Sequence, residues 1–327
     1  MLRSALRGFL ALVSALAPGM RLVPTFAQPR LYPPESAAAR VETTTDLVFG
    51  GGIRLLGVTL PHGRLEPGQG FSVEACWMAL APQSTDYTVF IHAIGPEDNR
   101  TAERHSYPGL GTFPTTLWPV DRAFCDRYTI EVEAWAEAPM VYRVMMGLFD
   151  ASTGERLSIT HSDGSPVDTP EVGSLAVVPA ASDGEWPGGP PVATLDSSVV
   201  LRSFDAPSEV TAGSAMTVTL YWEATATPAA DYTAFVHLWE SGMAQPLAQS
   251  DAPPRGGWFP TTVWIAGDRI MDVHVLHIPE GAPAGEVHLW AGLYHSDSGI
   301  RAAATESGAA YPDDLIPLGS IRILAHP

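Results

Sequence analysis

Two histidines hold the same place in a repeated motif, and imidazole is the side chain best suited to proton transfer or metal binding near neutral pH. His92 ends Asp-Tyr-Thr-Val-Phe-Ile-His, and His237 ends Asp-Tyr-Thr-Ala-Phe-Val-His 145 residues later. Neither has a second His or Cys nearby at the sequence spacing of a metal site. We therefore expect both to be packed, structural histidines that hydrogen-bond across a sheet, and we expect no metal and no cofactor.

Matched acidic residues are the next candidates, because two carboxylates about 5–10 Å apart can hydrolyse glycosides. Asp86 and Asp231 each begin the repeated motif. Asp126 and Asp272 share a second matched position. Such residues also cap turns or bind Ca²⁺, but Asp-x-Asp-x-Asp spacing is lacking, which favours turn capping. Because the sequence also lacks a Gly-x-Ser-x-Gly nucleophile motif, we expect no enzyme, with glycoside hydrolase as the less favoured alternative.

Aromatic side chains offer a different chemistry, since an exposed ring can stack on a sugar. The block Phe-Pro-Thr-Thr-Leu-Trp (113–118) recurs as Phe-Pro-Thr-Thr-Val-Trp (259–264). Its tryptophan is either a sugar platform or a plug at the end of a sandwich, and burial is the commoner fate of large aromatics. The candidate binding residues, of which the unmatched ones are favoured, are Tyr107, Trp118, Trp135, Trp239, Trp258, Trp264 and Trp290.

The repeats also define the domains that must position these residues. Three separate blocks recur at an offset of 145 or 146, which is far longer than a solenoid unit and indicates a duplicated domain. Within each copy apolar residues alternate with polar ones, as in 71–77 and 216–222, and this is the period of a half-buried strand. The 30 Gly and 30 Pro suit short strands joined by turns. We predict two tandem β-sandwiches of immunoglobulin-like or jelly-roll type.

The expected organisation has five parts. They are a signal peptide or membrane anchor (1–27), a Pro- and Ala-rich lead (28–40), domain 1 (41–179), a linker (180–191) and domain 2 (192–327). Arg3 and Arg7 precede an apolar run that ends before Thr25-Phe26-Ala27, the pattern of an export signal. We therefore expect an extracytoplasmic protein whose membrane contact is made only through this segment.

Charge and cysteine content constrain partners and compartment. The net charge of −18 excludes nucleic acid as a partner, because phosphate binding needs a basic surface. Cys76 and Cys125 would oxidise in an exported chain if they lie close together, but sequence alone leaves their pairing open. Domain 2 has Tyr221 and Met271 at the matched positions, so it folds without a bridge there.

Together these blocks resemble a module of Chloroflexota-type bacteria. They are, in order, Gly-Ile-Arg-Leu-Leu-Gly (52–57), Pro-Gly (67–68), a strand ending in Trp77, Tyr-Thr-Val-Phe-Ile-His (87–92), Ser-Tyr-Pro-Gly (106–109), 113–118 and Gly-Leu-Phe-Asp-Ala-Ser-Thr-Gly-Glu-Arg-Leu (147–157). In that family the module forms the extracytoplasmic C-terminal tail of membrane glycosyltransferases similar to dolichyl-phosphate-mannose enzymes. The membrane spans and the acidic catalytic loop of those enzymes are lacking here. The resemblance therefore implies an accessory envelope module and transfers no catalytic residue.

These observations give a leading hypothesis and one main alternative. The leading one is a non-enzymatic binding or scaffolding module of the cell envelope, with envelope glycan as a candidate ligand. The alternative is an accessory subunit, or a detached tail, of a membrane glycosyltransferase that acts through protein contacts.

Overall fold

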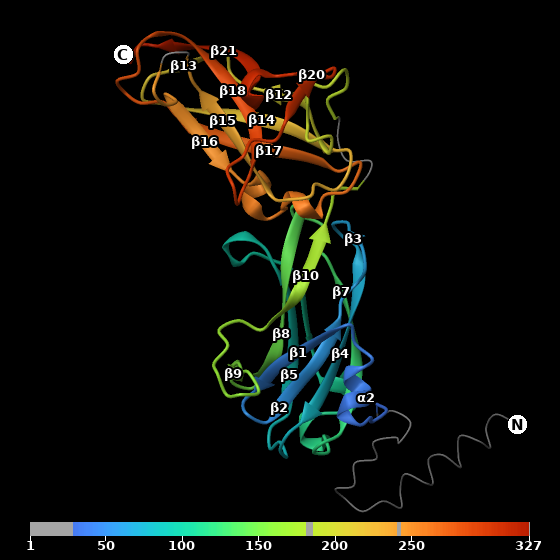
Figure 1. Cartoon of the computed structure of the whole chain (residues 1–327). Helices are drawn as coiled ribbons and strands as arrows, with labels where there is room; N and C mark the ends of the chain where they lie inside the picture. The colour runs from blue at the N-terminus through green and yellow to red at the C-terminus, as the bar shows by residue number, and fades with distance from the viewer. Residues whose placement is uncertain (1–28, 181–185, 241–242, 327) are drawn as a thin grey trace, which may run out of the picture.

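The computed structural model describes residues 29–180, 186–240 and 243–326, so the expected signal or anchor segment (1–27) lies outside the described residues. These residues form 21 strands in four sheets and one short α-helix, α2 (Pro34–Ala38). Figure 1 shows two β-domains in tandem, joined at a narrow waist. The predicted all-β fold with two tandem sandwiches is confirmed. In the described residues no helix is both long and apolar enough to span a membrane.

Domain 1 is a sandwich of two five-stranded sheets. The first has the order β7-β4-β2-β1-β9, with β1 (Thr43–Phe49), β2 (Ile53–Thr59), β4 (Gly70–Ala79), β7 (Ala123–Glu131) and β9 (Ile159–Thr160). The second has the order β3-β10-β8-β5-β6, with β3 (Arg64–Leu65), β5 (Tyr87–Ile94), β6 (Arg100–Ser106), β8 (Met140–Asp150) and β10 (Glu171–Val177). One apolar core fills the space between the sheets.

Domain 2 repeats this arrangement. Its first sheet has the order β17-β14-β12-β11-β19-β20, with β11 (Ala193–Leu195), β12 (Val199–Asp205), β14 (Ala215–Ala224), β17 (Arg269–His277), β19 (Ala304–Glu306) and β20 (Ala309–Ala310). Its second has the order β13-β21-β18-β15-β16, with β13 (Glu209–Thr211), β15 (Tyr232–Leu238), β16 (Ala248–Ala252), β18 (Gly285–His295) and β21 (Ile316–Leu324). Short 3₁₀ turns lie in the loops: η2 (Pro96–Asp98), η3 (Pro108–Gly111), η4 (Thr115–Leu117), η5 (Pro254–Gly257), η6 (Thr261–Val263) and η7 (Pro312–Asp314).

Alternation along the central strands builds each core. Trp77 on β4 pairs with Leu55, and Trp222 on β14 pairs with Leu201, and both tryptophans are completely buried. Because successive side chains of a strand point to opposite faces, the residues directly before and after each tryptophan face outward. The polar partners predicted in 216–222 accordingly lie on the outer face of domain 2.

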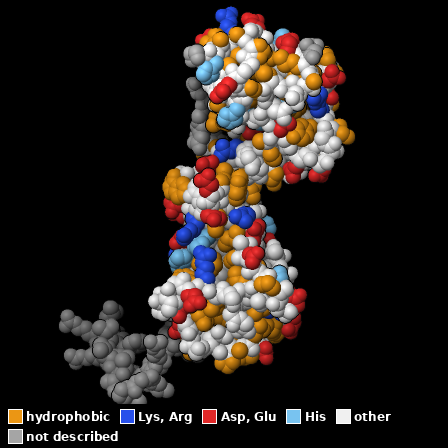
Figure 2. All heavy atoms as spheres, turned by 90° about the vertical axis from the view of Figure 1, so that its left-hand side faces the viewer, with side chains coloured by type: hydrophobic (Ala, Val, Ile, Leu, Met, Phe, Trp, Pro, Cys, Tyr) orange, Lys and Arg blue, Asp and Glu red, His pale blue; other side chains and the backbone are white. Residues whose placement is uncertain are grey.

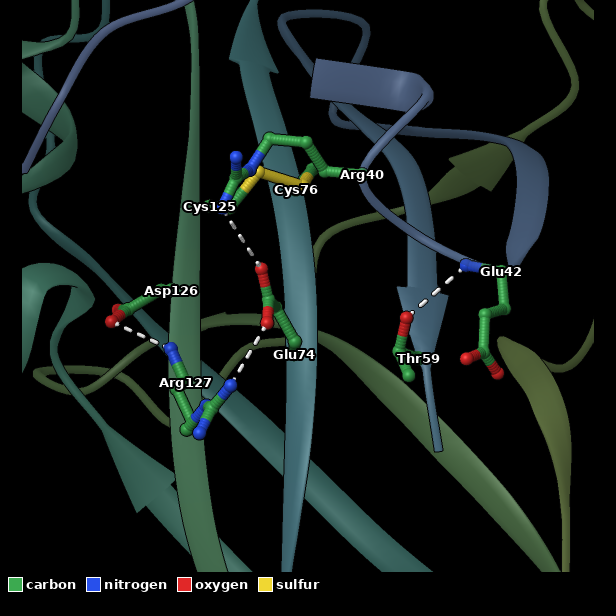
Figure 3. The surroundings of a disulfide bond; sticks show 8 residues. All are labelled: Arg40, Glu42, Thr59, Glu74, Cys76, Cys125, Asp126 and Arg127. Atoms are coloured by element: carbon green, nitrogen blue, oxygen red, sulfur yellow. Dashed lines mark hydrogen bonds and ion pairs between the residues drawn. A yellow bond between two sulfur atoms is a disulfide. The ribbon is translucent and has the colours of Figure 1, made fainter. Parts of the chain in front are cut away.

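The outer face of domain 1 is covered by the lead. Cys76 lies on the face of β4 away from the sandwich core, as its sequence position suggested, and it forms a disulfide with Cys125 directly opposite on β7. Helix α2 and neighbouring apolar residues pack over this bridge and leave Cys76 fully buried. In Figure 3 the Arg40 side chain lies beside the disulfide, and Glu74 reaches toward both Arg40 and Arg127.

The matched Gly-Leu-(Phe/Tyr) block needs a glycine at its first position because a phenylalanine ring of the neighbouring strand lies directly over it. A Cβ placed on Gly147 would lie 2.7 Å from the Phe90 ring, and one on Gly292 would lie 2.5 Å from the Phe235 ring. Real Cβ atoms essentially never approach that closely. The two glycines therefore allow the phenylalanines of β5 and β15 to lie flat on the neighbouring strand.

We expect Gly292→Ala to lower the free energy of unfolding by about 1–3 kcal/mol, because the added methyl group must displace the Phe235 ring. The control is Gly281→Ala, where an added Cβ meets nothing within 4 Å. That change should stay within about 0.5 kcal/mol of the wild type. Urea unfolding of both variants measures the difference, and equal stability would contradict the close packing at Gly292.

Reduction should destabilise domain 1 selectively. The bridge closes a loop across a sequence separation of 49 residues, which in the chain-entropy treatment stabilises a domain by roughly 4 kcal/mol. Thermal unfolding with and without reductant should shift a transition belonging to domain 1 and leave that of domain 2 in place. The variant Cys76→Ala/Cys125→Ala should match the reduced protein and should not respond to reductant. A shift of both transitions on reduction would argue against this assignment.

Candidate functional site

Strand pairing places a second histidine and a glutamate beside His92. His92 on β5 lies opposite Glu103 on β6, and His105 lies two residues further along β6. The two imidazole Nε2 atoms are 3.1 Å apart, and Glu103 carboxylate oxygens lie 3.9 Å from His92 and 3.6 Å from His105. The sequence shows no second histidine at metal spacing beside His92, and His105 reaches it only through the pairing of β5 with β6. Linear spacing missed His105 because the contact runs across the sheet.

Burial and neighbouring charges decide the protonation of this cluster. Burial lowers the pKa of His92 to about 4; the nearby Glu103 opposes the shift, and Arg100, His105 and Arg156 add to it. His92 is therefore neutral at pH 7. Partial burial would raise the pKa of Glu103, but the hydrogen bond from Arg100 and the electrostatic interactions with His92, His105 and Arg100 lower it overall.

The three side chains could in principle hold a divalent cation. Their donor atoms all lie within 4.8 Å of one another, and two histidines with one carboxylate leave a position open, as in catalytic zinc sites. Two guanidinium groups oppose a cation here: Arg100 donates to Glu103 at 2.7 Å, and Arg156 lies 4.6 Å above the Phe90 ring. The adjoining hollow of about 150 Å³ has room for roughly five water molecules.

Domain 2 keeps the framework of this cluster but changes its ligands. His237 has Gln249 and Asp251 where His92 has Glu103 and His105, and its Nε2 lies 2.8 Å from the Asp251 carboxylate. Arg301 lies 5.4 Å above the Phe235 ring, as Arg156 does above Phe90. A packed layer of phenylalanine, histidine and arginine thus belongs to both folds, which favours a structural role for the two histidines.

The matched aspartates fix loops by accepting hydrogen bonds from nearby backbone and hydroxyl groups. Asp86 accepts hydrogen bonds from the backbone N–H and hydroxyl of Thr116, and Asp231 does the same for Thr262. Asp126 accepts a bond from the Gly109 backbone. Burial raises the pKa of Asp126, although these backbone bonds oppose the shift. These contacts are those of turn capping.

Asp272 plays the matching part in domain 2. Its carboxylate accepts hydrogen bonds from the Arg255 backbone and the Trp222 indole, and its other neighbour is the buried His274 at 3.0 Å. Sequence reasoning did not single out His274. Its signal lay in the alternation along β17, where His274 shares the core-facing side of the strand with the buried Ile270 and Leu276.

The repeated Phe-Pro-Thr-Thr-x-Trp block is a self-contained plug. The indole N–H of Trp118 donates to Phe113 O at 2.9 Å, and that of Trp264 donates to Phe259 O at 3.0 Å. The buried Thr115 hydroxyl accepts from Tyr87 N–H and donates to Thr85 O, and Thr261 repeats both bonds in domain 2. Trp118 and Trp264 are buried, so neither is a sugar platform.

The unmatched aromatics do not share one surface. Trp239 and Trp290 are half-buried, and the Trp290 indole donates to Trp239 O. Trp135 and Tyr107 are 56% and 47% exposed, but Trp135 follows β7 and Tyr107 follows β6 at the opposite end of domain 1. Tyr107 lines a hollow of about 430 Å³ with Leu110 and Phe149. The exposed Trp135 and Tyr107 therefore offer separate contacts, whereas Trp239 and Trp290 lie together but are half-buried.

Trp258 instead lies at the joint between the domains. Its carbonyl accepts the Val141 N–H at 2.6 Å, its ring packs against the core of domain 1, and Arg143 lies 5.8 Å above it. Arg64 on β3 donates to the Asp268 carboxylate and to Val263 O, while Arg255 contacts Glu137 at 3.1 Å. Figure 1 shows β3 and the end of β10 at this waist.

We call residues 253–268 the docking loop of domain 2. The receiving end of domain 1 comprises Arg64, Glu137, Val141, Arg143 and Val178, of which Val141 and Val178 pack against the core of domain 2. The linker expected at 180–191 is described only in part, because 181–185 lie outside the described residues. Trp186 from that linker packs on Tyr221 of domain 2.

Comparison with known proteins adds a structural neighbour but no family. No family model matches the chain, and no curated protein matches it. Among solved structures, red sea bream transglutaminase is similar at 9% identity and a TM-score of 0.22. The match covers 84% of this chain and 31% of the transglutaminase, so the chain spans about a third of that protein's length.

We expect the burial of His92 to make stability fall in mild acid. Its pKa is about 4 in the folded protein, against 6.5 for an unperturbed histidine, so its contribution is complete above pH 6.5 and is lost as the pH falls toward 4. Between pH 7 and pH 5 the loss should be about 2 kcal/mol at most. His92→Gln should flatten the pH dependence of the free energy of unfolding.

The matched control is His237→Gln, which removes an imidazole from the same strand position of domain 2. Chemical denaturation at pH 7 and pH 5 compares the three proteins. Equal flattening by both substitutions would show that the buried imidazole of domain 1 is not the source.

Proposed function

We propose that the chain is a non-enzymatic scaffolding module of the cell envelope that works through protein contacts outside the cytoplasm. The observation that carries this proposal is the role that the Phe-Pro-Thr-Thr-x-Trp block plays in the two domains. In both domains it plugs the sandwich, and in domain 2 the same loop holds a neighbouring domain through Trp258 and Asp268. The module thus has a built means of binding protein surfaces.

The disulfide supports the extracytoplasmic part of the proposal. Disulfides such as Cys76–Cys125 form and persist in oxidising compartments and are rare in the cytosol. Figure 2 shows acidic and basic side chains mixed on one face of this acidic protein, without the large basic patch that nucleic-acid binding requires. An export signal or anchor in residues 1–27 would deliver the module there.

The resemblance to glycosyltransferase tails suggests the partner. A membrane glycosyltransferase that lacks such a tail would gain a rigid two-domain extension by binding this chain. In this proposal the module positions its partner or the partner's substrate and contributes no catalytic group.

The test is recovery of the tagged full chain from its own cells after trapping thiols with an alkylating reagent. We expect an oxidised chain in the extracytoplasmic fraction, co-purifying with a membrane protein. The variant Cys76→Ala/Cys125→Ala has no thiol that can be alkylated, so its mass shows what an unalkylated chain looks like, and it serves as the control. A chain recovered reduced, in the cytosol and alone would overturn the proposal.

Glycan binding is the second candidate function, favoured by the exposure of Trp135 and Tyr107. Retention of the purified chain on envelope glycan, lost in Trp135→Ala or Tyr107→Ala but kept in the half-buried control Trp290→Phe, would support it. Lack of retention on any envelope glycan would remove it. Cleavage of a glycoside panel would instead revive the hydrolase alternative.

A further inference from the structure

Both domains carry a docking loop and a receiving end, but the joint uses only one of each. The docking loop of domain 1 (107–122) and the receiving end of domain 2 remain outside the joint. Backbone contacts fix the correspondence: Asp121 N–H donates to Ala79 O as Gly267 N–H donates to Ala224 O, so Arg122 holds the place of Asp268.

The receiving ends correspond equally well. Arg64 pairs with Ala176 in the parallel ladder of β3 and β10, and Glu209 pairs with Arg322 in that of β13 and β21. Glu209 therefore holds the place of Arg64. By the same offset Leu324 holds the place of Val178, and Leu324 is 38% exposed.

These two surfaces lie at opposite ends of the molecule. The ten residues of β4 run from Gly70, near the joint, to Ala79, which contacts the docking loop of domain 1, a span of about 33 Å. In Figure 1, β3 lies at the waist whereas its counterpart β13 lies at the far end of domain 2. One molecule therefore cannot close its own second joint.

The charges at the joint are reversed at the two outer ends. Within the molecule Arg64 on the receiving end meets Asp268 on the docking loop. At the outer ends Glu209 replaces that arginine and Arg122 replaces that aspartate, and both are exposed. The outer ends also carry charges where the joint has none, since Asp121 stands at the place of Gly267 and Arg322, which lies 4.0 Å from Glu286, at that of Ala176.

This reversal permits one new pairing and opposes the others. The docking loop of domain 1 would bring Arg122 against Arg64 if it met another domain 1. The docking loop of domain 2 would bring Asp268 against Glu209 if it met another domain 2. Like charges at a contact suppress such pairings, whereas Arg122 against Glu209 is complementary.

The outer surfaces also offer apolar area. Leu110 and Leu117 on the docking loop of domain 1 are 72% and 46% exposed, although the lead passes beside Gly109. The receiving end of domain 2 forms a shallow hollow of about 510 Å³ lined by Glu209, Met216 and Leu324 among others. One end of the molecule thus carries an exposed apolar loop, and the other end carries a shallow hollow lined by both apolar and polar side chains.

We infer that the chain binds a second copy of itself head to tail, with the docking loop of domain 1 seated on the receiving end of domain 2 of the next molecule. The Arg122–Glu209 pair takes the place of the internal Arg64–Asp268 pair. Such a heterologous contact adds molecules in a row unless its rotation closes a ring. The association requires no foreign partner, so its failure would leave the proposed function untouched.

The test is sedimentation velocity of the full chain over a concentration series, at about 20 mM and about 500 mM salt. We expect the wild type to form elongated oligomers that dissociate with salt. Arg122→Asp and Glu209→Arg should each weaken association about tenfold or more, which corresponds to about 1.4 kcal/mol. Arg127→Asp, the same change on an exposed arginine in the middle of β7, is the control and should behave as the wild type.

Mixing provides the decisive arm. In a solution of the Arg122→Asp variant alone, the new aspartate of one molecule meets Glu209 of the next, and the like charges repel. In a solution of the Glu209→Arg variant alone, the new arginine meets Arg122 of the next molecule. An equimolar mixture restores opposite charges at every contact and should recover wild-type association, as should the double variant. A monomeric wild type at all concentrations, or oligomers that neither reversal weakens, would overturn the inference and, in the second case, indicate another surface or the N-terminal segment.

Discussion

The buried threonine of the Phe-Pro-Thr-Thr-x-Trp block is the contact on which the rest of the structure depends. Thr115 and Thr261 are completely buried, and each hydroxyl joins a loop to the start of an inner strand by two hydrogen bonds. A hydroxyl with both bonds made is well tolerated inside a core, whereas an unpaired one is costly. The loop is thereby held rigidly, so the residues before and after it project in a defined direction.

That rigidity explains how two similar folds serve different neighbours. The core residues of the loop are the same in both domains, while the residues that project from it differ. Trp258 and Asp268 contact the receiving end of domain 1, and the corresponding Thr112 and Arg122 carry a different surface. Duplication preserved the packed interior and left the outer ends free to diverge in charge.

The fold was largely predictable because its signals are local or repeated. The alternation around Trp77 and Trp222 marks central strands, and the constant offset marks two domains. The histidine cluster was not predictable in the same way, because His92 and His105 meet only through the register of β5 and β6. The joint was missed for a similar reason, since Arg64 and Asp268 lie 204 residues apart and neither belongs to a shared block.

The lead and the disulfide together define how a mechanical load would enter domain 1. The lead is joined to β7 by two backbone hydrogen bonds between Tyr32 and Ala123, and β7 is hydrogen-bonded to β4 in the sheet order. A strand at this end of a sheet is the first to peel when it is pulled. The covalent link from Cys125 to Cys76 instead carries the force directly into β4, the next strand inward from the edge of the sheet. A chain held by its N-terminal segment would thus bear tension through a cross-linked strand pair, and domain 2, which is not loaded from the lead, folds without one.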